Sequence, residues 1–257
     1  MVSRWLSSAS SDNLWRMRRL YPDPADEVDV ADAYAHQRGV VRVNMVASAD
    51  GAATLDGRSG GLSSAADKAL FLALRTYADV ILVGASTVRL ENYGPAKPKP
   101  AVQERRQADG LDPIPPIAIV TASLDLDPAA RFFTEAVVRP IVFTIDDADP
   151  DRRAALTAVA DVVSAGVGRV DLGTAMDLLA ERGLTRVLSE GGPALLGELV
   201  AAGRLDELAL TIAPVVAGGH SKRITDGPPV DPPTSMQLVH VLEEEQSLFL
   251  LYRASGQ

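Results

Sequence analysis

A carboxylate, an aromatic ring and a guanidinium share one face of a predicted helix. Asp67, Phe71 and Arg75 are spaced four residues apart, which places them on one side of a helix over Ser64–Tyr77. A carboxylate can bind the ring N–H groups of a flat heterocycle, a phenyl ring can pack against it, and a guanidinium can bind an anionic tail. Ser64 and Asp67 also have the spacing of a helix capping box. Both a substrate-binding role and a capping role therefore stay open for Asp67.

A glycine-rich turn predicts a binding site for a diphosphate. The segment 185–203 has the pattern of a strand, then Glu190-Gly-Gly-Pro193, then an apolar helix that ends at Gly203. The two glycines allow a close approach of the backbone to a ligand, and Pro193 suits the first turn of a helix. Free N–H groups and the helix dipole at such a start attract phosphate. We expect the diphosphate contacts to come from Gly191, Gly192, Pro193, Ala194 and Leu195.

Polar residues follow two further predicted strands. The strand 80–83 runs into Gly84, Ser86 and Thr87, a combination that suits a phosphate or a ribose. The strand 117–121 leads to the hydroxyls of Thr121 and Ser123, which we expect to hold a 2′-phosphate with a nearby arginine. No G-x-G-x-x-G motif is present, so the standard dinucleotide fingerprint is absent.

A third strand end carries Asp50, in the sequence Ser48-Ala-Asp50-Gly51. Its carboxylate is a candidate for substrate binding, and it also fits a simple turn, where Asp-Gly is common.

The elements that must position these residues alternate along the chain. Strands are predicted at Val40–Ser48, Asp79–Val83, Ile117–Thr121, Pro140–Thr144, Arg186–Ser189 and Glu207–Ala213. Helices are predicted at Ser64–Tyr77, Asp151–Ala160, Thr174–Arg182 and Ala194–Ala202. This alternation predicts an α/β fold, a mostly parallel sheet flanked by helices. The C-terminal segments Met236–Leu242 and Leu248–Tyr252 predict an antiparallel hairpin at one edge. The proline-rich stretches Gly94–Pro116 and Asp226–Ser235 are predicted to be surface loops.

Composition narrows the possible partners. The 257 residues carry a net charge of −9, which argues against nucleic acid or an anionic membrane as a general partner. The chain has no cysteine, which excludes disulfides, thiol nucleophiles and cysteine-bound zinc, and we predict no metal site. The first residues lack the apolar run of a signal peptide, so we expect a soluble, cytoplasmic protein.

Residues 1–36 differ from the rest of the chain. They contain both tryptophans, Trp5 and Trp15, with Leu14 and Met17 nearby. An isolated tail rarely carries so much apolar surface. We expect an N-terminal arm over 1–36 that packs on the main domain, 37–257, or on a second subunit.

Three motifs, in order, resemble the riboflavin-biosynthesis pyrimidine reductases. They are VNMVASADG at 43–51, the segment 62–94 that contains the Asp67 helix and ILVGASTV, and SEGGPALLGELVAAG within 189–219. This family is the C-terminal reductase half of a bifunctional deaminase-reductase and has a dihydrofolate-reductase-like fold. The resemblance covers about 40–253. The deaminase half is missing, because the chain has no H-x-E motif and no cysteine pair.

The resemblance implies a function and a set of contacts. It implies NADPH as cofactor, a homodimer, and reduction of the ribosyl group of a 5-amino-6-(5-phosphoribosylamino)uracil-type substrate. By position, the residues that contact the dinucleotide are Ala47, Thr87, Glu91 and the segment from Gly192 to Leu196. The residues that contact the substrate are Ser59, Arg75 and Glu190. The run Glu91-Asn92-Tyr93-Gly94 departs from the acidic pair and proline that many members carry there.

Two other functions stay open. Dihydrofolate reductases carry an acidic residue early on their first helix and a phenylalanine four residues later, and Asp67 and Phe71 resemble that pair. A dihydrofolate or other pteridine substrate would place its carboxylate tail at Arg75. In either reaction a hydride reaches an imine-like carbon, and Asp50, Asp67 and Glu190 are the candidates for orienting the substrate or relaying a proton. A protein that binds NADPH without turnover is a third possibility.

Overall fold

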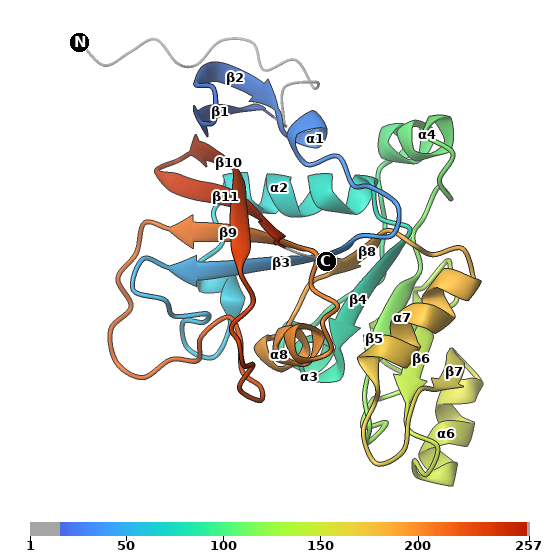
Figure 1. Cartoon of the computed structure of the whole chain (residues 1–257). Coiled ribbons are helices and arrows are strands. Elements are labelled where there is room, and N and C mark those ends of the chain that lie inside the picture. Colours follow the sequence, from blue (N-terminus) through green and yellow to red (C-terminus); the bar gives the residue numbers. More distant parts are fainter. Residues whose placement is uncertain (1–15, 256–257) are drawn as a thin grey trace.

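One twisted sheet organises the part of the chain that the structure, a computed structural model, describes, residues 16–255. Its eleven strands run in the order β2-β1-β10-β11-β9-β3-β8-β4-β5-β6-β7 (Figure 1). Neighbours from β9 to β7 pair in parallel, and those from β2 to β9 pair antiparallel. The predicted α/β class, with a mostly parallel sheet and an antiparallel C-terminal hairpin, is confirmed.

The boundaries of the eight predicted strands agree closely with the structure, whereas β1, β2 and β7 were not expected from the sequence. The parallel strands are β3 (Val41–Ser48), β4 (Val80–Gly84), β5 (Ile117–Val120), β6 (Ile141–Thr144), β7 (Asp161–Ser164), β8 (Val187–Ser189) and β9 (Glu207–Ala213). The antiparallel strands are β1 (Arg16–Tyr21), β2 (Ala25–Asp29), β10 (Met236–Glu244) and β11 (Ser247–Ala254).

The N-terminal residues that the structure describes belong to this sheet. β1 pairs with β10, and β2 pairs with β1 at the sheet's edge. Met17 is buried and packs in the same apolar cluster as Val30 of α1 and Leu242 of β10. Trp5, Leu14 and Trp15 lie outside the described residues, and the division of the chain at residue 36 stays a prediction.

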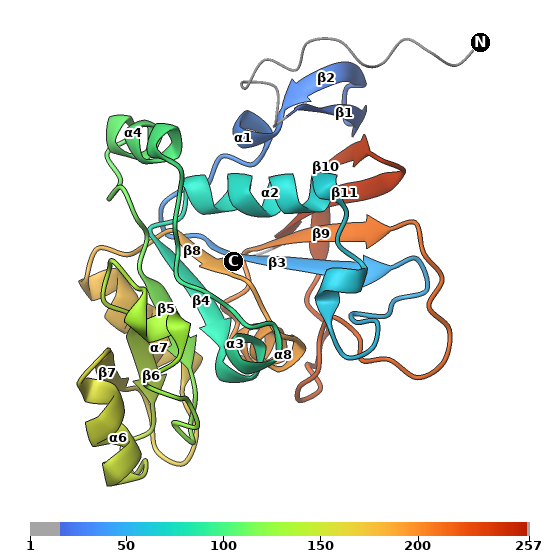
Figure 2. The same cartoon turned by 180° about the vertical axis from the view of Figure 1, so that it is seen from behind.

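Helices cover both faces of the sheet (Figures 1 and 2). They are α1 (Val30–Ala33), α2 (Ala65–Thr76), α3 (Ala85–Leu90), α4 (Pro100–Ala108), α5 (Arg131–Thr134), α6 (Pro150–Thr157), α7 (Leu172–Glu181) and α8 (Pro193–Ala201), with a 3-10 turn η1 (Ser59–Gly61). Alternate residues of β4 show how the faces divide, because side chains of a strand point to opposite sides in turn. Val80 and Leu82 pack with α7 and α8, whereas Ile81 and Val83 pack with α3, α5 and α6.

The stretch Gly94–Pro116 contains a helix where we expected a loop. Pro100 occupies the first turn of α4, where a missing N–H costs no hydrogen bond. Arg106 of this helix is fully buried and donates to the carbonyl oxygens of Arg75, Thr76 and Ala78 at 2.7–2.9 Å. These carbonyls lie at the C-terminal end of α2, where no further N–H group of the helix can bind them. The buried Arg106 guanidinium supplies the missing donors. The Asp226–Ser235 stretch contains no helix or strand, as predicted.

Two buried histidines should make the protein less stable in mild acid. Burial, and then the Arg42 guanidinium, lower the pKa of His36 to about 3 and that of His240 to about 4. Both histidines therefore stay neutral in the folded protein at a pH where the same side chains in the unfolded chain, with a pKa of about 6.5, bind a proton. The stability that the neutral histidines contribute is fully present above about pH 6.5. It should fall by up to about 1.4 kcal/mol per pH unit for each histidine between about pH 6.5 and 4.

Urea unfolding at pH 7, 6 and 5 measures this slope. The double variant His36→Gln/His240→Gln should show a shallower fall than the wild type. His220→Gln is the control, since His220 is exposed and should leave the slope unchanged. Equal slopes for the wild type and the double variant would contradict the expectation.

Candidate active site

Several of the predicted site residues lie where three central strands end. β3, β8 and β4 are neighbours in the sheet and run in parallel, so their carboxyl ends lie at one edge. Backbone bonds join the segments that leave β8 and β4: Glu190 N–H donates to the Leu82 carbonyl and Gly84 N–H to the Gly191 carbonyl, both at 2.9 Å. Val43 is the last residue of β3 that pairs with β8. β3 continues to Ser48, so Ala47 lies beyond the end of β8.

A side chain in the turn after β8 would crowd its neighbours. Gly191 has a φ of +80°, and a Cβ there would lie 3.0 Å from Met45 Sδ. A Cβ on Gly192 would lie 3.0 Å from Thr87 Oγ1. Gly192 also precedes α8, whose first N–H groups receive no side-chain cap. An uncapped helix start beside close-packed glycines is the geometry that favours an anionic group.

The start of α3 faces this turn. Gly84 precedes α3 and, like Gly192, supplies no side-chain cap. Thr87 lies against Gly192, whereas Ser86 is exposed. The structure therefore brings together two glycine-bearing strand ends and their hydroxyls, as the sequence predicted. Pro193, Ala194, Leu195 and Leu196 form the first turn of α8, with Leu195 and Leu196 buried in the core.

An ion pair lies beside these strand ends. Arg75 of α2 donates to both carboxylate oxygens of Glu190, Nε to Oε1 at 2.6 Å and Nη2 to Oε2 at 2.7 Å. The Tyr93 hydroxyl donates to Glu190 and accepts from Arg75 Nη2 at 2.6 Å. The Glu190 side chain is only 2% exposed. Sequence reasoning placed Arg75 and Glu190 at the site separately and missed both their pairing and Tyr93.

The charges of this cluster are fixed by their neighbours. Burial alone would lower the pKa of Arg75, but the Glu190 carboxylate raises it above its usual value. Burial, and then the Glu190 carboxylate, raise the pKa of Tyr93 well above 10. Tyr93 therefore keeps its proton and remains a donor to Glu190 at neutral pH. The guanidinium also lies 4.2 Å from the Phe71 ring centre. Two of the three residues on the predicted helix face, Phe71 and Arg75, therefore stack on each other.

Asp67 is buried but is not the cap of α2. Ser64 Oγ accepts from the Asp67 N–H at 3.1 Å, and Glu245 accepts from the Ala66 N–H at 3.2 Å. The Asp67 carboxylate instead accepts from the Ser63 hydroxyl, its one side-chain donor among residues 16–255. The helix start is thus satisfied by other groups, and the reciprocal half of a capping box is absent.

Asp50 anchors a loop. Its carboxylate accepts from the Ser48 hydroxyl at 2.5 Å and from the N–H groups of Ala217 and Gly218 at 3.0 and 2.8 Å. These bonds, led by that from Ser48, lower the pKa of Asp50 to about 2. Asp50 is therefore ionised at neutral pH and has no proton to donate. We do not retain it as a proton donor.

Other predicted contacts are partly occupied within the chain. Glu91 accepts from the N–H and the hydroxyl of Ser59 at 2.9 and 3.0 Å, so a predicted cofactor contact and a predicted substrate contact bind each other. Thr121 Oγ1 accepts from the Leu124 N–H at 3.1 Å, and Ser123 Oγ from the Asp125 N–H at 3.3 Å.

Two arginines border the turn after β5. Arg152 of α6 donates to the Ser123 carbonyl at 3.0 Å, and Arg89 of α3 donates to the Asp125 carbonyl at 2.7 Å. No local pattern indicates that α6 lies there, because the contact depends on the order of strands in the sheet.

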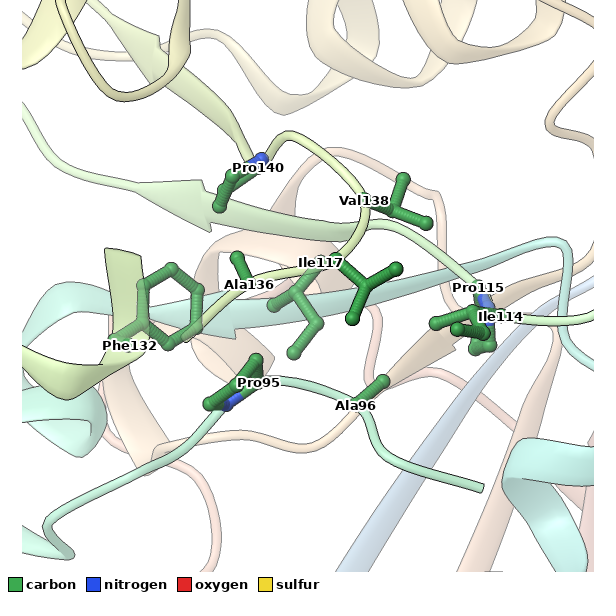
Figure 3. Close-up of a pocket in the computed structure, with 10 residues that line it drawn as sticks. Pro95, Ala96, Ile114, Pro115, Ile117, Phe132, Ala136, Val138 and Pro140 are labelled. Carbon is green, nitrogen blue, oxygen red and sulfur yellow. The ribbon is translucent and has the colours of Figure 1, made fainter. Parts of the chain in front are cut away.

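A small apolar pocket lies away from this edge, whereas a larger one is bordered by Tyr93 of the site. Figure 3 shows a small apolar depression between β5 and the 136–140 segment, with Phe132 and Ile117 in its wall. Its free volume of about 10 Å³ suffices for little more than one water. A second pocket, about 280 Å³, is bordered by Arg89, Tyr93 and Arg131. Within residues 16–255 no cluster of acidic or histidine side chains could hold a metal, and no helix could cross a membrane.

The sheet order and the glycine turn define an α/β protein with a candidate dinucleotide site at the carboxyl ends of its central strands. The chain belongs to the RibD C-terminal domain family, whose model matches residues 40–249. The resemblance inferred from the three motifs is therefore confirmed, and the protein is a reductase.

Relatives of known name agree with this assignment. The 2,5-diamino-6-ribosylamino-4(3H)-pyrimidinone 5′-phosphate reductase of Archaeoglobus fulgidus is 29% identical over 74% of this chain and 87% of its own. That of Methanothermobacter thermautotrophicus is 30% identical over 70% and 83%. The crystal structure of a pyrimidine reductase-like protein from Corynebacterium diphtheriae superposes with a TM-score of 0.77, at 28% identity, over 85% of this chain and 93% of that one.

Proposed function

We propose that this protein is an NADPH-dependent reductase of riboflavin biosynthesis. Its substrate is a pyrimidine with a phosphoribosylamino group, either the 2,5-diamino-pyrimidinone named for its relatives or the corresponding 5-amino-uracil. The observation that carries the proposal is the Gly191–Gly192 turn, packed against Thr87 at the uncapped start of α8. It supplies a place for a dinucleotide diphosphate in a chain related to pyrimidine reductases.

The cofactor contacts follow from this placement. Gly84, Thr87 and the first turn of α8 would hold the diphosphate, with Ser86 at the rim and Ala47 beside the nicotinamide end. Thr121 and Ser123 would hold the adenosine ribose, and the nearby Arg89 and Arg152 would favour its 2′-phosphate. When bound, the nicotinamide supplies a hydride.

The remaining residues bind and orient the substrate. Asp67 is a buried carboxylate whose single side-chain donor is Ser63, so it retains acceptor capacity for ring N–H groups. Asp67 is the candidate to relay the proton of the imine-like nitrogen, and Glu190, whose carboxylate is held by Arg75 and Tyr93, is a candidate to orient the substrate. Ser59 and Phe71 contribute contacts beside them.

A pteridine substrate is the second candidate, and one observation favours it: Asp67 and Phe71 lie one turn apart on α2, with Asp67 buried. The pairing of Arg75 argues against a folate. Two edges of its guanidinium already bind Glu190 and Tyr93, so it cannot also clamp a carboxylate tail with two bonds. The homodimer and the cytoplasmic location stay predictions.

Side-by-side assays of cofactor oxidation test the function. We expect NADPH oxidation at 340 nm with the phosphoribosylamino-pyrimidines and at least tenfold less with dihydrofolate. NADPH should exceed NADH in kcat/KM by at least about tenfold, since one charge-assisted hydrogen bond contributes about 1.5–3 kcal/mol. Arg152→Ala should reduce that preference, whereas Arg139→Ala should not, since Arg139 binds carbonyl oxygens at the C-terminal end of α6. Turnover of dihydrofolate alone would replace the proposed substrate, and absence of any turnover would indicate a binding protein.

A further inference from the structure

Tyr93 contacts two residues of the candidate site but has no role in the proposed reaction. Tyr93 follows α3, in the run Glu91-Asn92-Tyr93-Gly94 that departs from the family's usual residues. Its ring packs near Phe132, with ring centres 6.3 Å apart, and its hydroxyl reaches across to α2 and β8. It thereby joins three elements at the predicted substrate end of the site.

The hydroxyl of Tyr93 closes a three-membered network. It donates to Glu190 Oε2 and accepts from Arg75 Nη2, the same two atoms that already bond to each other at 2.7 Å. Arg75 Nε is held by the other Glu190 oxygen. The guanidinium plane is also fixed from the side, by Phe71 at 4.2 Å and Tyr93 at 5.5 Å. Rotation of the guanidinium would break several of these contacts at once.

One donor of Arg75 remains uncommitted. Within the described residues, Nη1 has no protein acceptor, while Nε and Nη2 are both used. The side chain is 17% exposed, and Nη1 is the guanidinium nitrogen whose two N–H groups are not bound to Glu190 or Tyr93. A single donor nitrogen suits one oxygen of a hydroxyl, carbonyl or phosphate, whereas a two-bond clamp on an anion needs two.

We propose that Tyr93 is a positioning residue that locks the Arg75–Glu190 pair, so that Arg75 presents Nη1 alone to a single oxygen of the substrate. This inference rests on the proposed function for the identity of that substrate. It makes Tyr93 a determinant of specificity: the locked arginine contacts the ribosyl or pyrimidine oxygen, and the phosphate is bound by other groups.

Kinetics of Tyr93→Phe test the proposal, because this change removes the hydroxyl and keeps the ring. We expect kcat/KM for the phosphoribosylamino-pyrimidine to fall about tenfold, with a slightly lower melting temperature, because a buried hydrogen bond is lost, and with unchanged affinity for NADPH. Tyr77→Phe is the matched control, since Tyr77 also accepts from an arginine, Arg105, at an exposed position. It should leave kinetics unaltered.

A double-mutant cycle separates positioning from independent binding. If Tyr93 acts through Arg75, the variant Arg75→Lys/Tyr93→Phe should lose no more activity than Arg75→Lys alone. Losses that multiply would overturn the proposal, as would wild-type kinetics in Tyr93→Phe.

Nitrogen-15 NMR of the arginine side chains gives a reading that needs no turnover. In the wild type, slow rotation should give separate signals for the Arg75 Nη protons, and Tyr93→Phe should average them. Averaged signals in both proteins would overturn the proposal even if the enzyme is active. Separate signals that are lost in the variant would support it even if the substrate proves to be different.

Discussion

Replacement of Gly192 with aspartate should lower the affinity for NADPH by at least about 100-fold. A Cβ at this position would lie 3.0 Å from Thr87 Oγ1, so either the turn or Thr87 must move. The new carboxylate would also stand at the start of α8, where the diphosphate is expected. Like charges brought together at an interface cost several kcal/mol, and about 2.7 kcal/mol corresponds to 100-fold in the dissociation constant.

Titration calorimetry with NADPH measures this loss directly. Ala201→Asp provides the control, because it adds the same charge to the exposed far end of the same helix. It should cost a little stability through the helix dipole and leave affinity unchanged. Circular dichroism would establish that both variants are folded. A folded Gly192→Asp protein with wild-type affinity would move the diphosphate away from the Gly191–Gly192 turn.

Elements with strong patterns could be predicted from the sequence. β9 matches its predicted range, Glu207–Ala213, and α2 differs by one residue at each end, because an apolar period and a serine cap define both. β7 was missed, since its four residues, Asp161–Ser164, lie at the sheet's edge and carry one exposed and three half-buried side chains. α4 was missed because the prolines in and around it and its charged residues are typical of a loop.

The site was predictable where local geometry determines it. The glycines at 191 and 192 were recognisable, because the backbone turn and the approach of Thr87 both require them. The pairing of Arg75 with Glu190 depends on α2 packing beside β8, 115 residues away along the chain. Tyr93 and Arg152 likewise reach the site through strand order, which no local pattern encodes. Site residues that lie on one helix, strand or turn can therefore be predicted from the sequence, whereas contacts between residues of different elements cannot.

Asp67 decides whether the helix stripe is catalytic or structural, and Asp67→Asn should lower kcat/KM by about 10- to 150-fold. Asparagine is nearly isosteric and can still accept from Ser63, so the fold should be kept. What it loses is the charge-assisted hydrogen bond to the substrate ring, which contributes about 1.5–3 kcal/mol. Cofactor affinity should stay at the wild-type value, since Asp67 lies on α2, away from the glycine turn.

Ser64→Ala is the matched control, because Ser64 supplies the cap that Asp67 does not. Its Oγ accepts from the Asp67 N–H at 3.1 Å, and loss of such a cap costs about 1 kcal/mol of stability. We therefore expect opposite signatures. Ser64→Ala should lower the melting temperature and keep kcat/KM, whereas Asp67→Asn should keep the melting temperature and lose kcat/KM. If Asp67→Asn instead lost stability and kept full activity on both pyrimidine and dihydrofolate, Asp67 would be structural. The proton would then have to be assigned to the Glu190 side of the site.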